Sequence, residues 1–172
     1  MIIDDEENLR KLMAKVISLE GYHVLEAASM KEGMKQLAKE NVLAVISDVK
    51  LPDGNGIDLT AKIKSEYQAT EVIVLTAYGT IQDGVRAIKN GAFDYLTKGD
   101  HQDKLIPLLS KAVEKARLQQ KVRELESRIS ERFGFENIIG KNKNLKLSVA
   151  LAKKVADTDS TGLILHSKAA AG

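Results

Sequence analysis

Three aspartates, one threonine and one lysine carry the side chains with which this sequence could do chemistry. They are Asp4, Asp5, Asp48, Thr76 and Lys98. Carboxylates brought together repel one another unless a cation lies among them, so such a cluster favours a bound metal. The sequence has no Cys and no His close to these acids. A site with oxygen ligands only suits Mg²⁺, which prefers carboxylates, carbonyls, water and phosphate oxygens.

The same residue types suit phosphoryl transfer. A carboxylate beside Mg²⁺ can attack a phosphoryl group and form an acyl phosphate, whose charge the metal shares with a nearby ammonium group. Lys98 is placed to supply that ammonium group. Thr76 could donate its hydroxyl to a phosphoryl oxygen and so couple the new charge to a movement of its loop.

Apolar runs alternate with stretches of helical periodicity along the first part of the chain. The predicted strands are residues 1–3, 22–26, 43–47, 72–76 and 92–97. The first predicted helix ends near Gly21, the next three cover residues 29–39, 57–67 and 81–90, and a long one begins at about residue 103. This order predicts an α/β fold, a doubly wound, five-stranded parallel sheet with helices on both faces, followed by a long helical linker.

The predicted strand ends explain how the reactive side chains could meet. Ligands bind such sheets beyond the carboxyl ends of the strands, and all five side chains follow or end a strand there. Singly, each has an ordinary explanation, such as a solvated acid at a helix start or a surface lysine. Their joint placement predicts a site.

Composition limits the remaining classes. The chain has 172 residues and a net charge of +2, which fits one core with an extension. The absence of Cys excludes disulfides, thiolate catalysis and Cys-based zinc sites. Apolar runs are too short to span a membrane and the N-terminus is acidic, so we expect a cytoplasmic protein. Basic residues from Lys111 to Arg132 are expected to be a solvated helix flank rather than a nucleic-acid surface.

The long helix changes its apolar register near residues 116–118. Before that point an apolar stripe is expected to dock on the domain; beyond it, the apolar positions step by four, three and four. They are Leu118, Val122, Leu125 and Ile129. This spacing is typical of a coiled coil and predicts a parallel dimer, in which Lys121 and Glu126 could pair across the two helices. The alternative is a lone amphipathic helix packed on its own domain, because two heptads are few for a coiled coil.

The spaced set of motifs resembles the receiver domain of two-component response regulators over about the first 115 residues. It comprises Asp4-Asp5-Glu6, Asp48 with Leu51-Pro52-Asp53-Gly54-Asn55-Gly56, Thr76-Ala77, and Asp94-Tyr95-Leu96-Thr97-Lys98. The resemblance implies the flavodoxin-like (CheY-like) fold. It also implies that Asp48 accepts a phosphoryl group from the phosphohistidine of a sensor kinase.

The same resemblance implies roles for the neighbouring residues. Asp5, Asp48 and the backbone carbonyl of Lys50 would ligate Mg²⁺, and Asp4 would act through water. Lys98 would contact the phosphoryl group, while Thr76 and Tyr95 would form a switch pair. Two features depart from the pattern: Gly99 stands where receivers usually have Pro, which leaves Lys98 less rigidly held, and the first strand is short.

A second, shorter resemblance lies near the C-terminus. Residues 134–141, 152–161 and 163–165 are similar to the opening of the AAA+ domain in NtrC-type transcriptional activators. No phosphate-binding loop follows in the sequence, so we expect no ATP hydrolysis and no DNA reading by this chain, only a regulatory fragment. The expected division is therefore a receiver domain at 1–116, a linker at 117–133 and the start of an AAA+-like region or tail at 134–172.

Three functions remain open from the sequence. The first is a phosphorylation-controlled signalling module, not an enzyme in its own right, with homodimer formation through its linker. The second is a Mg²⁺-dependent phosphohydrolase with Asp48 as nucleophile, although Lys50 stands where such enzymes typically carry a second acid. The third is an unphosphorylated dimerisation scaffold, against which the intact set of pocket residues argues.

Overall fold

A computed structural model of the chain describes residues 1–77, 79–99 and 101–133. The prediction for residues 134–172 lies outside the described residues. By its contacts the chain divides into two units, Met1–Val122 and Arg123–Gly172. The reactive residues identified from the sequence all belong to the first unit.

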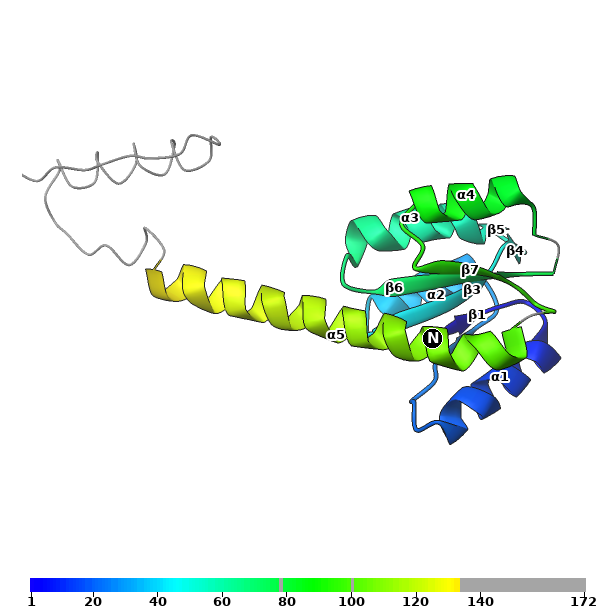
Figure 1. Cartoon of the computed structure of the whole chain (residues 1–172), viewed down its shortest axis with the longest axis horizontal. Helices are drawn as coiled ribbons and strands as arrows, with labels where there is room; N and C mark the ends of the chain where they lie inside the picture. Colours follow the sequence, from blue (N-terminus) through cyan, green and yellow to red (C-terminus); the bar gives the residue numbers. More distant parts are fainter. Residues whose placement is uncertain (78, 100, 134–172) are drawn as a thin grey trace, which may run out of the picture. The chain divides into compact units, whose positions relative to one another are not determined.

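Five parallel strands form the sheet of the first unit. They are β1 (Ile2–Ile3), β2 (Glu26–Ala27), β3 (Ala44–Asp48), β6 (Glu71–Thr76) and β7 (Asp94–Thr97). Their order is β2-β1-β3-β6-β7, and every pairing is parallel. The predicted doubly wound, five-stranded α/β fold is confirmed (Figure 1).

Helices cover both faces of this sheet. They are α1 (Glu7–Leu19), α2 (Met30–Leu37), α3 (Gly56–Glu66), α4 (Ile81–Lys89) and α5 (His101–Phe133). Helices α1 and α5 pack on one face, whereas α2, α3 and α4 cover the other. None of the helices in the described part of the chain is long and apolar enough to cross a membrane.

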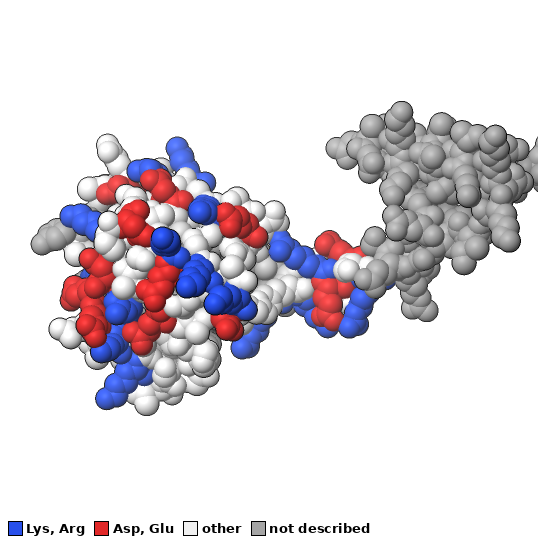
Figure 2. All heavy atoms as spheres, turned by 180° about the vertical axis from the view of Figure 1, so that it is seen from behind, with Lys and Arg blue, Asp and Glu red and all other residues white. Residues whose placement is uncertain are grey.

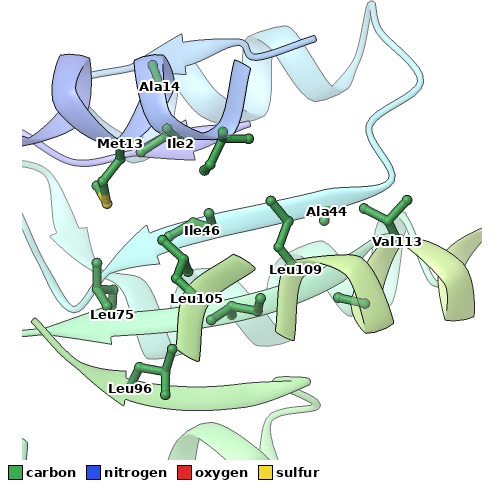
Figure 3. Packing of buried hydrophobic residues seen from close by; sticks show 13 residues of the cluster. Ile2, Met13, Ala14, Ala44, Ile46, Leu75, Leu96, Leu105, Leu109 and Val113 are labelled. Atoms are coloured by element: carbon green, nitrogen blue, oxygen red, sulfur yellow. The ribbon is translucent and has the colours of Figure 1, made fainter. Parts of the chain in front are cut away.

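The core under α1 and α5 explains the first apolar stripe of the long helix. Leu105, Leu109 and Val113 of α5 are at most 6% exposed and face strand residues such as Ile46 and Leu75 (Figure 3). Burying one such side chain contributes about 1.5–3 kcal/mol. The predicted docking of this stripe on the domain is therefore confirmed.

Two local predictions were wrong. The second strand is Glu26–Ala27 rather than residues 22–26, because β1 has only two residues and pairs with β2 at Ile2 and Ile3 alone. Pro52, Gly54 and Gly56 predict a loop after Asp48, but the segment holds an antiparallel hairpin, β4 (Lys50–Leu51) with β5 (Gly54–Asn55).

The helix starts follow their capping residues. Ser29 and Glu32 have the spacing of a capping box, and Ser29 does cap α2: its hydroxyl accepts the amide of Glu32 at 3.2 Å. The Glu32 carboxylate accepts the amide of Ala28 at 2.7 Å, one residue before the partner that a capping box would use. Asn55 caps α3 through the amide of Ile57, and Thr80 caps α4 through the amide of Asp83.

Candidate functional site

The carboxyl ends of the parallel strands bring the predicted residues to one edge of the sheet. Asp4 follows β1, Asp48 ends β3, Thr76 ends β6 and Lys98 follows β7. One carboxylate oxygen from each of Asp4, Asp5 and Asp48 lies within 4.8 Å of the other two. Asp4 and Asp48 are buried while Asp5 is exposed, so the cluster is open to solvent on one side.

Lys98 lies between the two buried aspartates. Its Nζ is 2.9 Å from Oδ2 of Asp48 and 2.9 Å from Oδ2 of Asp4, and its side chain is 15% exposed. Burial opposes the charge of the ammonium group, but the bonds to Asp4 and Asp48 together outweigh it and raise the pKa of Lys98. Lys98 therefore stays charged and already neutralises part of the cluster.

Backbone contacts hold Lys98 although Gly99 follows it. The amide of Lys98 donates to the carbonyl of Thr76 at 2.6 Å, which continues the pairing of β7 with β6. The sequence suggested a less rigid lysine at this position. The strand pairing and the two carboxylates fix both ends of the residue.

The aspartates are oriented by neighbouring amides. Oδ1 of Asp4 accepts the amide of Glu6 at 2.8 Å, and Oδ1 of Asp48 accepts the amide of Val49 at 2.7 Å. The carbonyl of Asp4 accepts a bond from Arg10, whose guanidinium also pairs with Glu26 at 3.3 Å. These bonds leave Oδ2 of both aspartates directed to Lys98.

Gly56, the last residue of the motif that follows Asp48, is a close neighbour of this phosphoacceptor candidate, although its type and spacing gave it no role of its own. A Cβ added to this glycine would lie 2.0 Å from the carbonyl oxygen of Asp48 and 2.8 Å from Oγ of Ser47. The amide of Gly56 donates to the carbonyl of Val49 at 2.9 Å. Only a residue without a side chain lets the start of α3 approach the end of β3 this closely.

Thr76 and Tyr95 lie together beside α4. Thr76 is 4% exposed, and Ala77, which follows it, is exposed. The Tyr95 ring is half-buried and packs against Gly79 and Gly84, where an added Cβ would come within 3.1 and 3.3 Å of its carbons. Burial is the largest cause that raises the pKa of Tyr95, the charge of Asp83 adds to it, and the Thr76 hydroxyl opposes both.

Lys50, whose carbonyl was expected to ligate a metal, opens the hairpin that follows Asp48 and has an exposed side chain. A cavity of about 290 Å³ lies elsewhere, lined by residues that include Tyr22, Leu43 and Arg117. Because none of the three carboxylates lines it, the cavity is separate from the candidate site. On the face shown in Figure 2, acidic and basic side chains are interspersed over the first unit.

Comparison with known proteins identifies the class. The family described as the response regulator receiver domain matches residues 1–110. The chain therefore belongs to the response regulator receiver domain family. Its relatives are NtrC-type regulators of two-component systems, which confirms the resemblance inferred from the motifs.

Individual relatives narrow the lineage. An NtrX-like response regulator of Rickettsia conorii is 34% identical over the whole chain, which spans 36% of that protein. The C4-dicarboxylate transport transcriptional regulatory protein DctD of Rhizobium meliloti is 31% identical over 95% of this chain and 35% of its own length. The chain thus spans about a third of the length of these curated relatives.

Solved structures agree with the fold. The beryllofluoride-activated receiver domain dimer of NtrC4 matches with a TM-score of 0.64 at 30% identity. The match covers 67% of this chain and 95% of the NtrC4 chain. NtrX of Brucella abortus in complex with ADP matches with a TM-score of 0.65 at 25% identity. The match covers 92% of this chain and 34% of the NtrX chain.

Proposed function

We propose that this chain is the phosphoacceptor module of a two-component system, in which Asp48 receives a phosphoryl group from the phosphohistidine of a sensor histidine kinase. The observation that carries the proposal is the placement of Lys98 Nζ, 2.9 Å from both Asp48 and Asp4, beside a third carboxylate. One ammonium group leaves this cluster with excess negative charge, which a divalent cation would balance.

The donor set fits Mg²⁺. Asp5, Asp48 and the backbone carbonyl of Lys50 would hold the ion and Asp4 would act through water; these are hard oxygen ligands, of which Mg²⁺ typically takes few from protein. When bound, the ion would withdraw charge from the phosphoryl oxygens. The exposed side of Asp5 leaves room for the remaining water and phosphate ligands.

The chain's own residues account for the transfer step. A carboxylate oxygen of Asp48 forms the new bond to phosphorus while the bond to the donor imidazole nitrogen breaks, and its electron pair stays on that nitrogen. Lys98 donates to a phosphoryl oxygen and so replaces one of its bonds to the carboxylates. Thr76, at the end of the adjacent strand, would donate its hydroxyl to a second oxygen, with Ala77 in the loop that moves with it.

Movement of Thr76 would alter the surface formed by α4 and β7 through Tyr95. The ring packs directly on Gly79, just before α4, and on Gly84 within it, so a shift of the Thr76 loop would change the space available to the ring. We propose that this pair passes the phosphorylation state to α4 and β7 and from there to an output region. By likeness to transcriptional regulatory relatives such as DctD, that output would activate transcription. The protein would act in the cytoplasm.

The alternative of a phosphohydrolase is separated from a receiver by stoichiometry. Intact-mass spectrometry after incubation with Mg²⁺ and acetyl phosphate should show the gain of one phosphoryl group. Asp48→Asn should abolish it, while Asp58→Asn, a matched change at an exposed aspartate, should keep it. Sustained release of phosphate from esters without a stable adduct would favour the enzyme, and no uptake in the presence of Mg²⁺ would favour the scaffold.

We further propose the division into a receiver at 1–116 and a linker at 117–133 that forms a homodimer. The apolar residues Leu118, Val122 and Leu125 support it, because they are 62%, 52% and 46% exposed in the single chain. The side chain of Ile129 lies outside the described part. The NtrC4 receiver, to which this chain is similar, was solved as a dimer.

A further inference from the structure

Asp53 joins two elements that are distant in sequence. Its Oδ1 accepts the amide of Met30 at 2.8 Å and its Oδ2 accepts the amide of Lys31 at 2.9 Å. Asp53 lies in the turn of the β4–β5 hairpin, whereas Met30 and Lys31 are the first two residues of α2. The bond from Lys31 is the largest cause that lowers the pKa of Asp53, so the carboxylate remains charged across the physiological range.

These two bonds complete the start of α2. The first amides of a helix have no partner within it, and α2 satisfies the third with Ser29 Oγ at 3.2 Å and the next with the Ser29 carbonyl at 3.0 Å. The first two, from Met30 and Lys31, donate to the carboxylate of Asp53. A carboxylate is also favoured at this end by the helix dipole. The contact is thus a specific helix cap delivered from another element.

The hairpin is held on its other side as well. Asn55 caps α3 through the amide of Ile57 at 2.8 Å, and Gly56 donates to the carbonyl of Val49 at 2.9 Å. The Met30 side chain packs on Gly54 so closely that an added Cβ would lie 2.3 Å from its sulfur. The hairpin between Asp48 and α3 is therefore fixed at two points: its turn is bound to α2, and the end of β5 is bound to α3.

Lys50 occupies the strand of the hairpin that leaves Asp48, paired with Asn55. Its backbone carbonyl lies two residues after the phosphoacceptor. Without the contacts of the hairpin to α2 and α3, this connecting segment would be more mobile, as surface loops are. We infer that Asp53 is a positioning residue for this carbonyl: by fastening the hairpin turn to the start of α2, it holds the backbone ligand of Lys50 in place for a divalent cation. The inference rests on the proposed function.

The test is the affinity of the full chain for Mg²⁺, measured by titration calorimetry without any phosphoryl donor. Loss of a contact to a metal ligand typically weakens binding by about 10–100-fold. Asp53 bonds to α2 and holds the hairpin rather than the Lys50 carbonyl itself, so we expect Asp53→Asn to raise the Kd for Mg²⁺ by the lower end of that range, on the order of tenfold. The asparagine can accept with one oxygen only and carries no charge. Asp58→Asn, which removes the same charge from exposed Asp58 on α3, should leave the Kd close to that of the wild type.

Two further readouts separate positioning from charge. Through-space attraction is strongly screened at 1 M KCl, where the Debye length is about 3 Å, whereas a misplaced carbonyl is not corrected by salt. The difference between Asp53→Asn and the wild type should therefore persist at 1 M KCl. In Mg²⁺-free solution, hydrogen exchange at the amides of Met30, Lys31 and the hairpin should be faster in Asp53→Asn only.

The outcomes are distinguishable. Equal Mg²⁺ affinity of Asp53→Asn and the wild type would overturn the inference and leave the proposed function intact, as would a difference that vanishes at 1 M KCl or that Asp58→Asn reproduces. A wild-type chain that binds no Mg²⁺ would instead overturn the proposed function itself.

Discussion

Lys98 and the aspartates around it form a charge cluster whose parts depend on one another. Lys98 contacts Asp4 and Asp48 at equal distances, and both carboxylates are nearly buried. A buried carboxylate is costly without a partner, so the lysine stabilises the site before any ligand binds. In the proposed function the same Nζ would turn to a phosphoryl oxygen, so phosphorylation would exchange these resting contacts.

Tyr95 gives a residue-scale prediction with a defined sign. Burial of the ring, and after it the charge of Asp83, raise the pKa of Tyr95 above the ordinary value for tyrosine. A raised pKa in the folded chain means that its contribution to stability is full below pH 10 and is lost as the pH rises through the higher folded value. In an absorbance titration of the four tyrosines, the wild type should show a late component above the ordinary tyrosine range.

Tyr95→Phe should remove that late component. Titration curves of the wild type and Tyr95→Phe that coincide at their alkaline end would mean that Tyr95 is not held as described.

At the scale of elements, Glu71 joins both faces of the sheet at the start of β6. It is fully buried, and its two oxygens lie 3.2 Å from Nζ of Lys64 on α3 and 3.1 Å from Nζ of Lys115 on α5. Lys64 also donates to the carbonyls of Gln68 and Thr70, and the Lys115 ammonium lies 5.3 Å from the centre of the Phe93 ring. One carboxylate therefore ties a helix of each face to the central part of the sheet.

Glu71→Gln should lower the free energy of unfolding of the chain by about 1.5–3 kcal/mol, the range for hydrogen bonds to charged groups. The amide keeps the size of the side chain but loses both ion pairs, while the lysines can still reach water. Urea denaturation followed by circular dichroism measures the change. Glu66→Gln, at an exposed position of α3, should stay within about 0.5 kcal/mol of the wild type, and an equally stable Glu71→Gln would refute the tie.

Across the whole molecule, the spacing of apolar residues and the alternation of strands and helices predicted most of the fold. The five parallel strands, the docked stripe of α5 and the meeting of Asp4, Asp48 and Lys98 follow from alternation and from strand ends, which are local signals. The contacts of Asp53 and Glu71 were not predicted. Each joins residues from elements that periodicity treats separately, and the bonding partners become known only when those elements pack.

The same limit explains the shorter errors. The extent of β2 depends on the length of β1 beside it rather than on its own apolar residues. The β4–β5 hairpin carries turn residues that a loop would also carry, and its pairing needs the anchors on α2 and α3. Gly56 belongs to the motif, but the need for a glycine there is visible only in the structure, where an added Cβ would lie 2.0 Å from the carbonyl oxygen of Asp48.

The linker gives a prediction for the whole molecule. Leu118, Val122 and Leu125 are exposed at coiled-coil spacing, and burying one such side chain contributes about 1.5–3 kcal/mol. Val122→Lys should therefore weaken self-association at least about tenfold in analytical ultracentrifugation, since 1.4 kcal/mol is a factor of ten. Leu19→Lys, a change at a more exposed leucine on α1, should leave association unchanged.

Addition of beryllofluoride should change the association of the wild type, in a direction that we leave open, because the first part of the same helix packs on the receiver core. Identical sedimentation with and without the phosphoryl mimic would contradict this coupling. A monomeric wild type would contradict the dimer itself.

Chemical mapping of the phosphorylated residue tests the central claim most directly. Borohydride reduces an aspartyl phosphate to homoserine, and peptide mass spectrometry then locates the altered residue. After incubation of the full chain with acetyl phosphate and Mg²⁺, we expect homoserine at position 48 alone, and none when Mg²⁺ is replaced by a chelator. Homoserine at Asp4 or Asp5, or at no position in the presence of Mg²⁺, would contradict the assignment of Asp48 as the phosphoacceptor.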